Sequence, residues 1–169
     1  CLHIRYVSER LHDMHDWIVR LIYICFYSWW LCQKNFIYFD ELVPYIMLLI
    51  QPFESAVEKV EILSEELPLG HKVLTQKEER EKMFIEDRCQ YNVRGYLDLC
   101  EGIGSRENKI VLGVTDVDLF SRELNFVFGS ARSGSWGCVI STHRLGEGNK
   151  FRERVVKEAV HEVGHVVGF

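Results

Sequence analysis

Lys109-Ile110-Val111-Leu112-Gly113-Val114 is the clearest strand in this sequence of 169 residues, because no polar side chain interrupts it after Lys109. A continuous apolar run of this kind is typical of a strand that is buried on both faces of a sheet. Shorter apolar runs on either side predict four more strands, over residues 46–51, 71–75, 126–130 and 138–142. The sequence therefore predicts a sheet built around residues 109–114.

Amphipathic helices are expected to pack on this sheet. Residues 55–67 place apolar side chains among glutamates at helical spacing, which predicts a helix with one buried face. Residues 91–100 repeat the pattern, with Gly102 and Gly104 expected beyond the end of the helix. The charged segment 76–88 fits either a helix or a solvated loop.

The last helix is expected over residues 150–167, with Asn149 as its N-cap. Its valines form an apolar stripe, which indicates one buried face. The order strand, helix, strand, helix, three strands and helix predicts an α/β fold, a mixed and mostly parallel twisted sheet with packed helices. The last helix would run across the sheet, and a site on this helix would open toward an edge strand.

The final helix carries the most informative motif, His161-Glu162-Val163-Gly164-His165. Two histidines four residues apart lie on one face of a helix, so that both imidazoles can bind a single metal ion. The pattern H-E-x-x-H is typical of zinc hydrolases, in which the glutamate deprotonates a zinc-bound water as general base. The alternative is a chance match on a surface helix, and the valine-rich buried stripe argues against it.

A third zinc ligand is expected outside this sequence. Gly168 lies three residues past His165 and can end the helix in a left-handed turn, after which a later residue could return to the metal. The chain stops one residue later, at Phe169. We therefore expect a fragment that is cut before its metal site is complete.

Residues Phe126, Val127, Phe128 and Gly129 are candidates for a substrate cleft, because an edge strand beside the metal can pair with an extended peptide. An ordinary inner strand remains the alternative.

Asp116 and Asp118 alternate at the end of a strand, where they could form a carboxylate dyad. A structural role is favoured, in which they bind the backbone amides of the following loop. His143 is interpreted as a solvated or hydrogen-bonded residue.

The composition excludes some classes of protein. The formal net charge is −5 without a block of basic residues, so that nucleic acid is not an expected partner. The six cysteines form no C-x-x-C pair and suggest no disulfide framework, which favours a reduced, cytoplasmic setting. The oligomeric state is left open by the sequence.

Residues 1–46 differ in composition from the rest of the chain. They hold 11 of the 21 aromatic residues but no glycine, alanine or threonine, and all 12 glycines follow residue 69. We interpret residues 1–46 as an atypical extension, translated from upstream sequence, and 47–169 as the domain. A membrane anchor is the alternative, but the uncharged run over 21–32 is shorter than the roughly 20 residues that span a bilayer.

Six short stretches together carry a family resemblance, in an order and spacing that extend from Met47 to Phe169. The chain resembles the archaemetzincins, which are zinc-dependent metallopeptidases of the metzincin clan, whereas residues 1–46 match nothing in that family. The stretches are 50–52 (IQP), 90–92 (QYN), 110–120 (IVLGVTDVDLF), 125–129 (NFVFG), 141–145 (STHRL) and 153–162 (ERVVKEAVHE).

The resemblance implies the N-terminal subdomain of a zincin-like, metzincin fold. Carried over to this sequence, it implies that His161 and His165 bind the catalytic zinc and that Glu162 is the general base. The third histidine would fall two positions after Phe169, so that the resemblance implies a fragment that is inactive as it stands. The implied substrate is a peptide or protein, and the alternative is a non-catalytic metal-binding or structural relative with the same fold.

The resemblance also implies a second, structural zinc held by four cysteines, together with a methionine turn under the catalytic metal. Both belong to the C-terminal part that follows the third histidine. Cys89, Cys100 and Cys138 are therefore not expected to substitute for those ligands.

Overall fold

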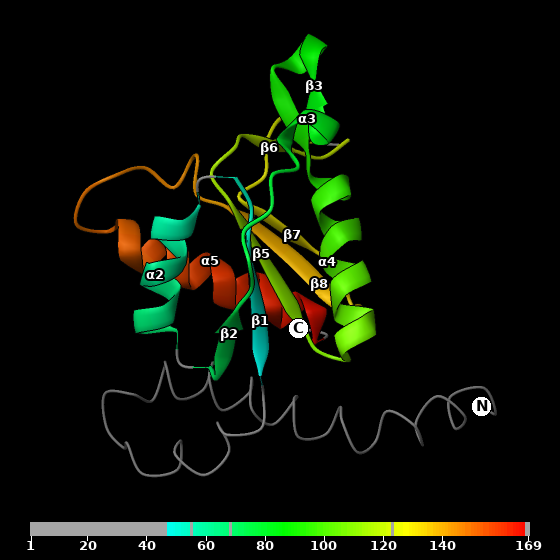
Figure 1. Ribbon diagram of the computed structural model, residues 1–169. Helices are drawn as coiled ribbons and strands as arrows, with labels where there is room; N and C mark the ends of the chain where they lie inside the picture. Colours follow the sequence, from blue (N-terminus) through cyan, green and yellow to red (C-terminus); the bar gives the residue numbers. More distant parts are fainter. Residues whose placement is uncertain (1–46, 55, 68, 123, 168–169) are drawn as a thin grey trace, which may run out of the picture.

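The computed structural model describes residues 47–169, except 55, 68, 123, 168 and 169. The predictions for residues 1–46 and for Gly168 lie outside the described residues. At the centre is a five-stranded sheet with the order β2-β1-β5-β8-β7 (Figure 1). The first four strands in this order are parallel and β7 is antiparallel at one edge. The strands are β1 Leu48–Pro52, β2 His71–Val73, β5 Val111–Thr115, β7 Gly129–Ala131 and β8 Gly137–Ser141.

The predicted α/β fold with a mostly parallel sheet is confirmed. Strand β5 lies in the middle, where Leu112 is in register with Ile50 of β1 and with Cys138 of β8. Alternate residues of these strands point to opposite faces, so that Leu112 contributes to one hydrophobic core and Val111 to the other. Both faces of the sheet are therefore buried, as the unbroken apolar run predicted.

Three helices cover the two faces of the sheet. Helices α2 (Val57–Glu66) and α5 (Phe151–Val166) pack on one face, and α4 (Val93–Glu107) packs on the other (Figure 1). Arg152 at the start of α5 makes ion pairs with Glu65 and Glu66 of α2. Helix α5 then crosses β7 and β8, so that its C-terminal half lies beside the edge of the sheet. None of the described helices is long and apolar enough to cross a membrane.

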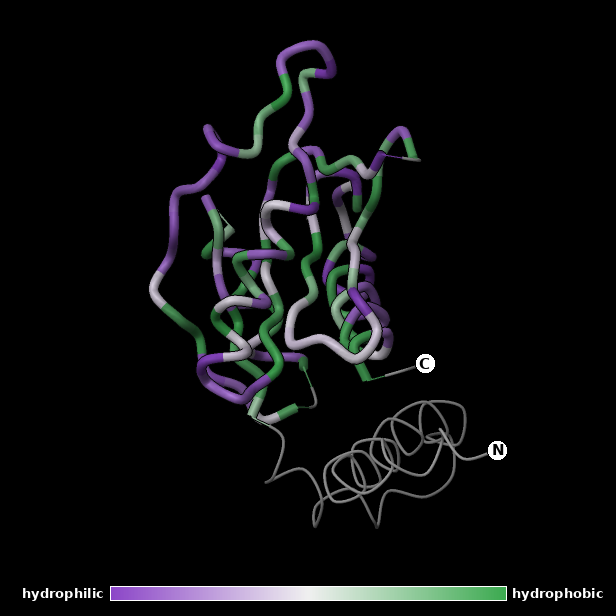
Figure 2. The backbone as a smooth tube through the Cα atoms, turned by 90° about the vertical axis from the view of Figure 1, so that its right-hand side faces the viewer, coloured by the Kyte–Doolittle hydropathy of each residue, from purple (hydrophilic) through white to green (hydrophobic). Residues whose placement is uncertain are grey.

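A small second sheet was not predicted from the sequence. It has the order β3-β4-β6 and projects beyond the main sheet, with the short α3 beside it (Figure 1). Figure 2 shows that the tip of this projection is mainly hydrophilic and that a hydrophobic stretch lies directly below the tip. The elements are α3 Arg80–Met83, β3 Phe84–Ile85, a 3-10 helix at Glu86–Arg88, β4 Gln90–Asn92 and β6 Leu119–Phe120.

Two local predictions about helix ends were wrong. Helix α4 does not stop before its glycines but continues through Gly102 and Gly104 to Glu107. Helix α5 has Lys150 at its N-cap, without a capping side chain, so that Asn149 does not cap it. Gly104 is needed for packing, because a Cβ atom there would lie 2.5 Å from the Cβ of Trp136 and 2.7 Å from the carbonyl oxygen of Lys109.

Replacing Gly104 with alanine is therefore expected to destabilise the fold by about 1–3 kcal/mol, the usual cost of overpacking a filled site. The matched control is Gly102→Ala in the same helix, where a Cβ atom meets only the end of Arg106 at 3.8 Å. The control should raise stability by up to about 1 kcal/mol through helix propensity. Urea unfolding of both variants tests this, and equal effects would contradict the packing role of Gly104.

Candidate metal and catalytic site

Helix α5 brings His161 and His165 together one helical turn apart. Their Nε2 atoms lie 3.0 Å apart, and their exposed rings pack edge to face with centroids 4.4 Å apart. Two nitrogens bound to one tetrahedral zinc at 2.0–2.1 Å lie about 3.3 Å apart, so that only a small rotation of the rings is needed. The end of the helix is fixed by Gly134, whose N–H donates to the carbonyl of Val166 at 2.9 Å.

Glu162 points to the opposite side of the helix from solvent and is 5% exposed. Its side chain lies against Gly129, the first residue of β7. A Cβ atom at residue 129 would be 2.6 Å from the Cγ of Glu162 and 2.9 Å from its Oε1. The absence of a side chain at Gly129 therefore allows the carboxylate to lie between the helix and the edge strand.

The electrostatic environment of Glu162 favours its neutral form. Burial raises the pKa of Glu162 to about 7, and the negative charge of Glu158, one turn earlier, adds to the shift. Burial also raises the pKa of Glu158, and the positive charges of His161 and His165 partly oppose this shift. Two carboxyl groups and two imidazoles thus lie within about two turns of α5.

The site fits a divalent metal such as zinc. Glu162 Oε2 is buried and has no hydrogen-bond partner among the described residues, which is unusual for a carboxylate oxygen. On the exposed side of the same helix are two imidazoles of the kind that zinc binds, His161 and His165. Within the described part of the chain, however, no group of three His, Cys, Asp or Glu side chains is placed to hold a metal ion.

The edge strand beside the site is shorter than predicted. Strand β7 begins at Gly129, so that Phe126, Val127 and Phe128 precede it. The N–H of Val127 donates to the carbonyl of Leu119 at 2.9 Å, which turns this segment toward the small sheet. The carbonyl of Phe128 still accepts from the N–H of Ser141 at 2.6 Å, continuing the pairing with β8. In the described sheet β7 is an edge strand and not an inner strand.

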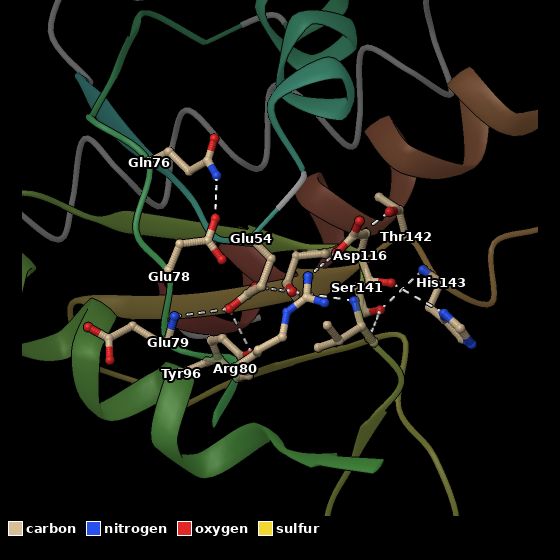
Figure 3. A network of polar contacts seen from close by, with 12 residues as sticks. Glu54, Gln76, Glu78, Glu79, Arg80, Tyr96, Asp116, Ser141, Thr142 and His143 are labelled. Carbon is tan, nitrogen blue, oxygen red and sulfur yellow. Dashed lines mark hydrogen bonds and ion pairs between the residues drawn. The ribbon is translucent and has the colours of Figure 1, made fainter. Parts of the chain in front are cut away.

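A buried polar network joins the carboxyl ends of the parallel strands (Figure 3). The carboxylate of Glu54 is fully buried and accepts from the hydroxyls of Tyr96 at 3.1 Å and Thr115 at 2.6 Å. The N–H of Glu79 approaches the same group at 3.3 Å. Burial raises the pKa of Glu54, and these three donors oppose that shift. The network ties the ends of β1 and β5 to α4 and to the segment before α3.

Asp116 and Asp118 do not form a dyad, because different groups hold them. Asp118 makes a bidentate ion pair with Arg144, with both N···O distances 2.6 Å, and the hydrogen bond from Arg144 lowers the pKa of Asp118. The Oδ1 atom of Asp116 lies 4.0 Å from the Nη2 atom of Arg80. The backbone carbonyl of Asp116 lies 3.2 Å from the Nδ1 atom of His143. For Asp118 the predicted structural role stands, although the partners are side chains instead of loop amides.

Sequence reasoning missed three residues around the site. Glu158 could have been found, because it lies four residues before Glu162 and hence on the same helical face. Gly129 had been assigned to the cleft but not as the residue that makes room for Glu162. Arg144 gave no signal, since its contact with Asp118 joins residues that are distant in sequence.

Comparisons with known proteins find relatives of this chain. The model of the family described as peptidase family M54 matches residues 26–169, a range that begins upstream of Met47. The archaemetzincin of Archaeoglobus fulgidus is 39% identical over 125 residues, covering 70% of this chain and 75% of that protein. The archaemetzincin of Natronomonas pharaonis is 41% identical over 92 residues. This match covers 48% of this chain and 52% of that protein.

A solved structure shows the same fold. The crystal structure of the Archaeoglobus fulgidus archaemetzincin complexed with malonate superposes with a TM-score of 0.66 at 38% identity. The match covers 73% of this chain and 79% of that one. The predicted resemblance to the archaemetzincins is therefore confirmed.

Proposed function

The chain belongs to peptidase family M54, and we propose that it forms the zinc-binding half of a peptidase active site in which Glu162 is the general base. One observation carries the proposal. The Nε2 atoms of His161 and His165 lie 3.0 Å apart on α5, and the buried carboxylate of Glu162 in the same helix has an oxygen without a hydrogen-bond partner among the described residues. These are the residues of the zinc hydrolase motif, and the meeting of the two histidines on one helix supports the proposal.

His161 and His165 would hold the zinc through their Nε2 atoms, and the third ligand would come from a histidine two positions after Phe169. Zinc, when bound, acts as a Lewis acid that polarises the substrate carbonyl and activates water at neutral pH. Because no third ligand is present among the described residues, the chain itself is expected to bind zinc weakly and to be inactive. A second, structural zinc would belong to the same C-terminal part.

Glu162 would move the proton. Its Oε2 atom takes a proton from the attacking water and returns it to the nitrogen of the leaving amine. Helix α5 and Gly129 hold the carboxylate in a buried position that excludes competing hydrogen bonds. This chain therefore supplies the base and two ligands of the site.

The substrate would be a peptide or protein that binds in extended form along the edge of the sheet. Phe126, Val127, Phe128 and Gly129 would line this cleft, with the peptide backbone pairing to the free side of the segment. The negative net charge argues against nucleic acid as a partner. The free cysteines at 89, 100 and 138 are consistent with a cytoplasmic location.

A non-catalytic, metal-binding relative is the second candidate, because a third ligand is missing from the described residues. The coding sequence beyond Phe169 separates the two functions. A histidine codon two positions on, followed by cysteine, supports the peptidase, and its absence supports the non-catalytic relative.

The metal requirement is the direct test. We expect the protein extended through the third ligand to cleave peptides, to lose this activity when a chelator removes zinc and to regain it when zinc is restored. Residues 1–169 alone should show weak zinc binding in calorimetry and no cleavage. Cleavage that survives complete removal of zinc would contradict the proposal.

A further inference from the structure

Two aromatic rings are exposed directly before the strand that touches Glu162. The side chains of Phe126 and Phe128 are each 39% exposed and pack edge to face, with ring centroids 5.4 Å apart. Phe128 is followed by Gly129, which contacts the Glu162 side chain. Exposed aromatic rings that pack on each other beside a polar site are typical of a binding surface.

The ring of Phe126 is held in place by a neighbouring arginine. The guanidinium of Arg144 lies over it, 4.5 Å from the ring centroid, in a cation–π contact. Arg144 is in turn fixed by the bidentate ion pair with Asp118. The amide of Gln90 donates to Asp118 at 3.0 Å and to the carbonyl of Asn125 at 2.9 Å.

The backbone of the same segment is equally fixed. The N–H of Val127 and the carbonyl of Phe128 are both hydrogen-bonded, to Leu119 and Ser141. The rings are therefore presented by a rigid segment, and little conformational entropy is lost when a ligand contacts them. Asp118 offsets the charge of the Arg144 guanidinium that lies over Phe126, and the exposed rings themselves present an apolar surface, which suits an apolar group.

We propose that Phe126 and Phe128 form a subsite for a large apolar side chain of the peptide substrate, with Arg144 as the residue that positions Phe126. The proposal rests on the peptidase function proposed above and names its substrate class. Since an extended chain advances about 3.3 Å per residue, the apolar side chain would lie within about three residues of the scissile bond. Peptides with leucine or phenylalanine there would be preferred over those with aspartate or lysine.

The test uses short blocked peptides in which one position at a time carries leucine, phenylalanine, aspartate or lysine. Their binding to the zinc-free chain is measured by NMR titration, which requires no turnover. Phe128→Ala and Phe126→Ala should each weaken the preference for apolar peptides by roughly 10-fold or more. Leu124→Ala is the matched control, because Leu124 is 56% exposed in the same segment and is not part of the ring pair.

Arg144→Ala has a distinct signature in the active, extended protein. It should raise KM for apolar peptides and leave kcat, and the KM of polar peptides, unchanged. An apolar preference that survives both phenylalanine variants, or no preference among the peptides in the unmodified chain, would overturn the subsite. Binding preference without cleavage would overturn the peptidase function alone, whereas cleavage without preference would overturn the subsite alone.

Discussion

Replacing Glu162 with glutamine is expected to lower peptide turnover by roughly 10²–10⁴-fold in the zinc-loaded, extended protein, which is the usual contribution of a general base. This corresponds to about 3–5 kcal/mol of transition-state stabilisation. Glutamine has the same shape as Glu162 and fits beside Gly129, but it cannot accept the proton. Zinc should remain bound, because its ligands are histidines and Glu162 is not a ligand. Steady-state kinetics and zinc analysis on the same preparation measure both effects.

Two further measurements make this result interpretable. Glu153→Gln is the matched control, since Glu153 is on the exposed side of the same helix and forms an ion pair with Lys157; the turnover of this variant should be unchanged. The zinc-free Glu162→Gln chain should be more stable than the unmodified chain above about pH 7. The reason is that the native pKa of Glu162 is raised from 4.5 to about 7, so that its ionisation costs stability as the pH rises. Full turnover in Glu162→Gln would exclude Glu162 as the base.

Replacing Gly129 with alanine is expected to lower turnover by roughly 10²-fold, because misplacing a catalytic group by about 1 Å has an effect of this size. The new Cβ atom would lie 2.6 Å from the Cγ of Glu162, so that the carboxylate or the strand must move. The fold should lose about 1–3 kcal/mol of stability from the same overlap. Kinetics and urea unfolding, with zinc content as a check, measure the two effects.

Gly164→Ala adds the same methyl group to α5, two residues after Glu162, where it meets no described atom within 4 Å. It should leave turnover unchanged. If both alanine variants reduce activity equally, the loss comes from α5 and not from the contact between Gly129 and Glu162. If neither does, the edge strand does not hold the base in position.

Sequence alone predicted the elements whose pattern is long and regular. Residues 109–114 and 138–142 were correctly identified as strands because both faces of the sheet are covered and their apolar runs are unbroken. The histidines of α5 were predicted to meet because helical geometry fixes side chains four residues apart. In both cases local rules were sufficient.

Predictions failed where the outcome depends on contacts between distant residues. Strands β3 and β6 have two residues each, too few to show an alternating pattern. Gly104 looked like a helix end, but its role comes from the backbone of Lys109 and from Trp136 across the packing interface. The contact of Gly129 with Glu162 likewise depends on how the edge strand crosses α5. No local rule contains this information.

The position of α5 also bears on how the protein acquires its fold. The sheet is joined by pairings between distant segments, such as Leu49 with Val111, and structures with high contact order fold slowly. Helix α5 packs across β7 and β8 and against α2, so that its docking surface exists only after these segments have assembled. We therefore expect its two histidines to become oriented in a late folding step. Zinc would act on this domain as a ligand that stabilises the finished fold, not as a template around which the chain first condenses.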